Sequence, residues 1–340
     1  MEIRPVDVSD DAEFHAFHVA AEEAQRHGRP YSSFWSEQQV RSLMRAEPTD
    51  QRISGFAAFE GDEVVGTGII FLPLLDNLDK VYFSIDTRPA YRRRGIGSAL
   101  LEHVVSFALS EGRSLLLGES FYPLDADDHH PHKRFAAKHG FTIGNEEVRR
   151  VLPLPVPDEQ IQQWAEESAV HHDGYLIETH VDDIPEPLLA SYVQLLNQLA
   201  VDAPTGEIDF EAGAVPVEVY LQNAERSRVS GRQTYRTVAV TSGPDGKQEA
   251  VAHSALACPP PGSDEPNLYQ FGTLVRADHR GHRLGMAVKA ANLRAVQKDH
   301  PERTIVTTTN SAVNGPMVAI NERMGFRPVD VTAEFLRKLD

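Results

Sequence analysis

The chain has 340 residues, of which 41% are hydrophobic and 24% charged, and it carries a net charge of −17 at pH 7. This composition lies in the ordinary globular range and excludes both a disordered chain and a membrane protein. The strong negative charge argues against a nucleic-acid partner, which usually requires a basic surface.

Targeting signals and disulfides are not expected either. The longest nearly apolar segment, residues 64–75, contains two glycines and a proline and is too short to cross a bilayer. The N-terminus is acidic where a signal peptide would be basic. The single cysteine, Cys258, cannot form an internal disulfide. We therefore expect a cytoplasmic protein with no membrane partner.

The first half of the chain predicts a hairpin followed by alternating strands and helices. Residues 53–60 and 63–72 form two strands joined across Gly61 and Asp62. A strand at 80–87 enters a glycine loop, and a helix over 98–112 follows because its apolar residues recur at helical spacing. A strand at 114–120 and a helix ending in residues 139–141 complete this segment.

The second half repeats the same order. Strands are predicted at 234–240, 249–257 and 268–275, with a turn over 242–246 between the first two. A loop, a helix over 286–297, a strand at 303–309 and a helix ending at 324–326 follow. The spacing also matches, with 43 positions from Gly97 to Gly140 and 40 from Gly285 to Gly325. Matched order and spacing indicate two copies of one unit.

These patterns predict an α/β (α+β) protein of two tandem domains, each a mixed, mostly antiparallel sheet flanked by helices. A length of 340 residues fits two domains of about 150 residues each. The proline-rich stretch at 152–160 is the expected boundary. We expect an N-terminal domain at 1–153, a linker with a short helix at 154–174, and a C-terminal domain at 175–340.

The first glycine loop has the properties of a phosphate site. Three arginines stand directly before its glycines, in a protein that is otherwise acidic. A strand that leads through such a loop into a helix collects backbone N–H groups and the positive end of the helix dipole at one place. A pyrophosphate would fit there, and the alternative is an ordinary turn on a basic surface patch. No Walker A or GxGxxG pattern is present.

Residues 87–103, TRPAYRRRGIGSALLEH, resemble the acetyl-CoA signature of the GNAT superfamily of acetyltransferases. Its loop reads Arg or Gln, two residues, Gly, one residue, Gly or Ala, and Arg92, Gly95 and Gly97 match it. Residues 273–289 resemble the same signature except that Arg283 stands at the first glycine. The family's asparagine, eleven residues before a terminal Gly-Phe, corresponds to Asn314, whereas the first copy has His129. The chain thus resembles tandem members of the superfamily, the type that includes mycothiol synthase.

The resemblance implies an enzyme that transfers an acetyl or other short acyl group from acetyl-CoA directly to a small amine, with no metal. CoA would lie where the loop strand splays from the next strand, and backbone groups would hold its pantetheine arm. The residues implied in binding are Thr87, Arg92, Arg93, Arg94, Gly95, Ile96, Gly97 and Ser98 in the first copy, and Val275, Arg280, Gly281, His282, Arg283, Leu284, Gly285, Met286 and Asn314 in the second. The first copy, with the complete loop, is expected to supply the principal CoA site.

Candidates for acid and base catalysis lie on the first loop strand and its neighbour. Tyr82, Ser84 and Asp86 alternate and should share one face. Asp86 is the preferred base and Glu119 the second candidate, although an acid at a strand end is more often solvated. In the second copy Tyr269 and Thr273 should share a face.

The family's usual acid, a tyrosine, is replaced in both copies. Ala136 stands at its position in the first copy and Asn321 in the second. This motivates an alternative function, a CoA-binding regulatory or scaffolding protein whose catalytic sites have decayed.

Three further groups are given structural interpretations. Residues 125–133 combine three aspartates and three histidines, but without zinc-type spacing they predict a solvated loop. Cys258 has no base nearby and is not expected to act as a nucleophile. Lys289, Arg294 and Lys298 are predicted to form a solvated helix face.

Overall fold

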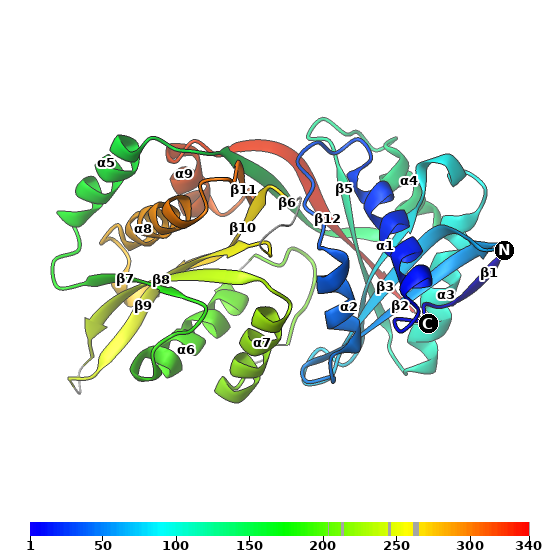
Figure 1. Cartoon of the computed structure of the whole chain (residues 1–340), viewed down its shortest axis with the longest axis horizontal. Helices are drawn as coiled ribbons and strands as arrows, with labels where there is room; N and C mark the ends of the chain where they lie inside the picture. Colours follow the sequence, from blue (N-terminus) through cyan, green and yellow to red (C-terminus); the bar gives the residue numbers. More distant parts are fainter. Residues whose placement is uncertain (203, 212–213, 244–245, 261–264, 340) are drawn as a thin grey trace. The chain divides into compact units, whose positions relative to one another are not determined.

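The computed structural model describes residues 1–202, 204–211, 214–243, 246–260 and 265–339. The chain divides into two compact units, and in each of them helices cover a mixed sheet (Figure 1). Unit 1 contains Met1–Val148, Thr205–Glu211 and Val329–Asp340, and unit 2 contains Arg149–Pro204 and Ala212–Pro328. The predicted fold class is confirmed.

Side-chain caps set the start of the first two helices of unit 1. Asp10 accepts hydrogen bonds from the N–H groups of Ala12 and Glu13 at the start of α1, and Ser36 forms a capping box with Gln39 at the start of α2. The elements are β1 (Glu2–Pro5), α1 (Asp11–Arg26), α2 (Glu37–Arg45), β2 (Gln51–Glu60), β3 (Glu63–Pro73), β4 (Lys80–Thr87), the 3-10 turn η1 (Pro89–Tyr91), α3 (Ile96–Ser110), β5 (Leu115–Tyr122), α4 (Pro131–Lys138) and the first part of β6 (Thr142–Pro153).

The sheet of unit 1 has the order β1-β2-β3-β4-β5-β12. Strand β12 (Arg327–Lys338) is the last of the chain, and from Val331 to Lys338 it pairs antiparallel with β5. The contiguous domains expected from the sequence placed this strand with the second copy, whereas the structure pairs it with the first. Such a long-range pairing leaves no mark on local sequence patterns.

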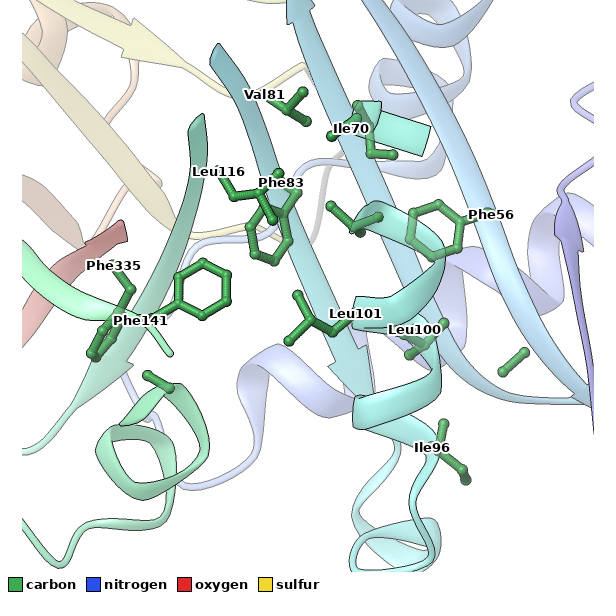
Figure 2. Packing of buried hydrophobic residues seen from close by; sticks show 14 of the residues in the cluster. Phe56, Ile70, Val81, Phe83, Ile96, Leu100, Leu101, Leu116, Phe141 and Phe335 are labelled. Atoms are coloured by element: carbon green, nitrogen blue, oxygen red, sulfur yellow. The ribbon is translucent and has the colours of Figure 1, made fainter. Parts of the chain in front are cut away.

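Helices bury both faces of this sheet, and alternate residues of each strand point to opposite faces. Phe56 and Ala58 pack with α3, whereas Ala57 and Phe59 pack with α1 and α2. Figure 2 shows Leu100 and Leu101 of α3 directed toward the strands. The core therefore fixes α3, and with it the glycine loop, against the end of β4.

Unit 2 repeats this plan with different lengths of element. It contains α5 (Asp158–Ala169), β7 (Leu176–Val181), α6 (Glu186–Asp202), α7 (Val217–Val229), β8 (Gln233–Ser242), β9 (Gln248–Cys258), β10 (Asn267–Val275), η2 (Ala277–His279), α8 (Leu284–Asp299), β11 (Ile305–Ser311) and α9 (Gly315–Arg323). Its strand order is β11-β10-β9-β8-β7. The predicted turn over 242–246 includes Pro244 and Asp245, which lie outside the described residues.

The segment expected to be a linker is part of the core of unit 2. Val156, Ile161 and Trp164 are buried with Leu293 and Val296 of α8. In the described part of the chain, no helix is both long and apolar enough to cross a membrane.

Candidate active site

In unit 1, strands β4 and β5 separate halfway along their length. They pair in parallel from Lys80 opposite Leu115 to Phe83 opposite Gly118. Beyond that point β4 pairs only with β3, as far as Thr87, while β5 continues beside β12. One edge of β4 after Phe83 thus has no strand partner in the structure described. Its N–H and C=O groups are available to an extended ligand.

The open edge leads into the first glycine loop. Arg93 and Gly95 have left-handed backbones, with φ of 66° and 88°. Helix α3 begins at Ile96, with Gly95 as N-cap and no side-chain capping bond. The first N–H groups of the helix therefore point out of its end without a capping side chain, where the helix dipole favours an anion.

The arginines of this loop are exposed and keep their charge available. Arg92 donates to the carbonyl of Thr87 at 3.3 Å, and the Arg94 guanidinium lies 4.8 Å from the centre of the Tyr91 ring. The Glu60 carboxylate approaches Arg94 only to 4.0 Å. A Cβ added at Gly97 would meet its neighbours at ordinary contact distances, so the fold itself does not require glycine at this position.

The second loop has left-handed residues at the same two positions as the first, but glycine and arginine have changed places. Gly281 has φ of 88° and Arg283 has φ of 53°, at the positions of Arg93 and Gly95. Each loop thus holds one arginine in the left-handed region, which costs about 1–2 kcal/mol for a non-glycine residue. The departure from the signature at Arg283 leaves the shape of the loop unchanged.

The side chains of the second loop are engaged by their own unit. Arg280 donates to the Asp202 carboxylate at 3.1 Å, and His282 Nδ1 lies 3.1 Å from the carbonyl oxygen of His171, in the turn after α5. Arg283 donates to the main-chain carbonyl of Glu167 at 3.4 Å. A Cβ at Gly285 would lie 3.0 Å from Ile320. This loop offers an anion less charge and less space than the first.

Strands β10 and β11 also part, after Tyr269 opposite Thr307. The register of β10 against β9 shifts between Gln270 and Thr273. This bulge makes the prediction that Tyr269 and Thr273 share a face wrong, because an extra residue reverses the alternation. Tyr269 is 39% exposed, whereas Thr273 is buried with its hydroxyl 3.1 Å from that of Ser254.

Asn314 is the N-cap of α9, and its side chain accepts a hydrogen bond from the Met317 N–H. Its role in holding this helix is thus structural. The predicted role in CoA binding stays a prediction.

The two predicted carboxylates lie on neighbouring strands of unit 1, Asp86 on β4 and Glu119 on β5. Asp86 accepts a hydrogen bond from Gln25 at 3.0 Å, and burial raises its pKa to about 6. Burial, followed by the charge of Glu334, raises the pKa of Glu119 to about 7. The Glu119 side chain keeps access to solvent, so this carboxyl is surrounded by protein and still reachable. Burial also raises the pKa of Tyr82, so its hydroxyl stays protonated at neutral pH and cannot accept a proton as a phenolate.

Three residues of this region were missed by the sequence analysis. Gln25 and Arg29 come from α1 and the turn after it, and Glu334 lies directly opposite Glu119 on β12. The Arg29 guanidinium lies 3.6 Å from the centre of the Phe121 ring and 3.6 Å from the Asp330 carboxylate. The sequence holds one signal for Glu334, which is an acidic residue inside the otherwise mostly apolar strand at residues 331–336.

The histidine-rich segment at 125–133 is partly tied into the fold. His130 caps α4, and His132 Nδ1 lies 2.8 Å from the carbonyl oxygen of Phe121. In the described ranges no three His, Cys, Asp or Glu side chains are placed to hold a metal ion.

Two other groups of the sequence analysis can be placed. Cys258 is fully buried, and burial raises its pKa to about 12. Lys289 was predicted to be solvated, which is wrong. Its ammonium is buried, donates to Gln270 Oε1 at 3.1 Å, and burial lowers its pKa to about 7. Arg294 and Lys298 are exposed as predicted.

Comparison with protein families bears on this site. The model of the acetyltransferase (GNAT) family matches residues 18–141, which include the parted strands, the first loop and α3. Residues 18–141 form a GNAT acetyltransferase domain. The match supports acyl transfer from coenzyme A as the general activity of this GNAT domain.

Solved structures extend the likeness to the whole chain. A tandem GNAT protein from the clavulanic acid biosynthesis pathway is 23% identical, with a TM-score of 0.76 over 99% of this chain and 98% of its own. A GCN5-related N-acetyltransferase from Sphaerobacter thermophilus is 12% identical, with a TM-score of 0.64 over 99% and 95%. The N-myristoyltransferase of Saccharomyces cerevisiae, solved with myristoyl-CoA, is 11% identical, with a TM-score of 0.59 over 98% and 79%. The chain therefore has the tandem GNAT fold. No curated protein sequence matches it.

Proposed function

We propose that the chain is an acyl-CoA-dependent N-acyltransferase that transfers an acetyl or short acyl group to a small amine, and that unit 1 holds the working site. The observation that carries the proposal is the open edge of β4 that leads into an uncapped helix N-terminus beside three exposed arginines. An extended thioester arm followed by a pyrophosphate has the shape and charge that this arrangement suits.

The residues of unit 1 can be given roles in binding. The N–H groups of Ile96, Gly97 and Ser98 would bind the pyrophosphate, and Arg92 to Arg94 would add charge-assisted hydrogen bonds. The free edge of β4 up to Thr87 would pair with the amides of the pantetheine arm. Glycine at position 97 would let a phosphate approach the helix backbone with no side chain in between.

Acyl-CoA supplies the activated acyl group as a thioester. The amine nitrogen forms a bond to the acyl carbon, the bond from that carbon to sulfur breaks, and the amine loses one proton. Asp86 is the preferred acceptor of this proton and Glu119 the second candidate, because their pKa values of about 6 and 7 are close to the working pH. A thiolate with a pKa near 8.5 leaves readily and takes a proton from solvent or from this acid.

Unit 2 is proposed to contribute a weaker CoA site or a packing surface. Its loop backbone matches that of unit 1 and its strands part in the same way, which supports binding at Val275 and at the start of α8. The ion pair of Arg280 with Asp202 and the tight surroundings of Gly285 oppose it.

Thiol release from acetyl-CoA, followed over a panel of small amines, tests the proposed reaction. Wild-type protein should release thiol with at least one amine, and the double variant Asp86→Asn with Glu119→Gln should lose most of this rate. The release signal is clean because the single cysteine is fully buried.

The alternative, a CoA-binding regulatory or scaffolding protein, is favoured by Ala136 and Asn321 at the positions of the family's acid. Asn321 is buried and hydrogen-bonded to Asn310 at 2.5 Å, so it offers no acid in its place. CoA binding without turnover on any amine would favour this second function.

A further inference from the structure

The last strand of the chain brings a carboxylate into the site of unit 1. In the antiparallel pairing of β12 with β5, Glu334 lies directly opposite Glu119. Residues directly opposite in such a pair point to the same side of the sheet, with Cβ atoms about 5 Å apart. Two ionised carboxylates in this relation repel each other.

The neighbours of the pair show which face it occupies. Phe335 and Ala333 pack in the core with α3, so Glu334 and Glu119 point to the opposite side. On that side lie Tyr82 and Asp86 of β4, next to α1. The pair therefore lies on the face that carries the proposed proton acceptors.

Charges of both signs act on Glu119, and Glu334 has the largest effect among them. Arg29 is the positive group near Glu119, and its guanidinium also lies close to Asp330. Glu147 adds a further negative charge, and the one polar contact of Glu334 that the structure gives is a long one of 3.5 Å from Asn145 Nδ2. Protonation of either glutamate removes the repulsion within the pair.

We propose that Glu334 is a positioning residue for acyl transfer in unit 1, which acts through Glu119, so that the C-terminal strand is part of the first copy's site. The inference rests on the proposed function and takes its second candidate, Glu119, as the group that transfers the proton. With Glu334 opposite, Glu119 keeps its proton up to neutral pH and releases or accepts it where the reaction runs. Without Glu334, Glu119 becomes more acidic, although its burial still holds its pKa above the ordinary value.

The direct test is a carboxyl NMR titration of Glu119 in the full chain, assigned by its loss in Glu119→Gln. In the wild type the midpoint should lie near pH 7, and in Glu334→Gln it should fall by about one pH unit. Lys338→Gln, at the exposed end of the same strand, should leave the midpoint unchanged. Glu334→Asp keeps the charge and should keep most of the shift, and it serves as a second variant if the amide disturbs folding.

The catalytic readout is the pH profile of kcat/KM for thiol release. Its acid limb should move to lower pH in Glu334→Gln and be restored in Glu334→Asp. An unchanged NMR midpoint in Glu334→Gln overturns the inference, and so does a midpoint that moves while the acid limb stays. Absence of turnover by the wild type with every amine would instead overturn the proposed function, whatever the titration gives.

Discussion

Replacement of Gly97 by valine should abolish most CoA binding while leaving unit 1 folded. A Cβ at this position would lie 3.4 Å from the ring of Phe135 and 3.6 Å from the Thr87 hydroxyl, which are ordinary contacts. Valine also costs no more than glycine within a helix. The branched side chain would stand where the pyrophosphate meets the first turn of α3. Loss of two charge-assisted hydrogen bonds of about 1.5 kcal/mol each amounts to about 3 kcal/mol, or roughly a hundredfold in Kd.

Calorimetric titration with CoA measures this loss, and Gly285→Val in the second loop is the matched control. We expect Gly285→Val to change the principal affinity little, although its Cβ approaches Ile320 to 3.0 Å and some stability is lost. Thermal denaturation of both variants separates misfolding from blocked binding. Undiminished binding by Gly97→Val, together with loss in Gly285→Val, would refute the assignment of the principal site to unit 1.

Three further predictions follow from the same structure. CoA at about 100 times its Kd should raise the free energy of unfolding by roughly 2.7 kcal/mol in a thermal shift experiment, and no shift at millimolar CoA would contradict the site. Because the folded pKa of Asp86 is about 6 and its usual value is 3.8, its contribution to stability is full below pH 3.8 and is lost as pH rises through 6. Asp86→Asn should therefore be up to about 3 kcal/mol more stable than wild type at pH 8 in urea titrations, with little gain at pH 3.5. Cys258→Ala should leave the rate of acyl transfer unchanged, and an acylated Cys258 found by mass spectrometry would show that the mechanism is wrong.

The sequence predicted those parts of the molecule that local patterns determine. The hairpins β2–β3 and β8–β9 and the helices α3 and α8 follow from alternation and helical spacing, and the structure confirms them. Glycine also places both loops between a strand and a helix, whereas the left-handed backbone of Arg93 and Arg283 has no signal in the sequence. The sequence also named Asp86 and Glu119 as candidate bases, and their catalytic role stays a prediction.

The parts that escaped prediction depend on long-range pairing. Glu334 reaches Glu119 only because β12 lies beside β5, more than two hundred positions earlier in the chain. The bulge in β10 puts Thr273 on the face opposite to the predicted one. The alternation of residues in the sequence does not reveal such an extra residue. The buried ammonium of Lys289 is compensated by a hydrogen bond to Gln270, which the pattern of charges along the helix cannot reveal.

The most direct test of the central claim is an experimental structure of the full chain with bound CoA. The account predicts the pyrophosphate at the start of α3, about 2.9 Å from the N–H groups of Ile96 and Gly97, with the pantetheine arm along the open edge of β4. CoA bound only at the start of α8, or at neither helix, would contradict it.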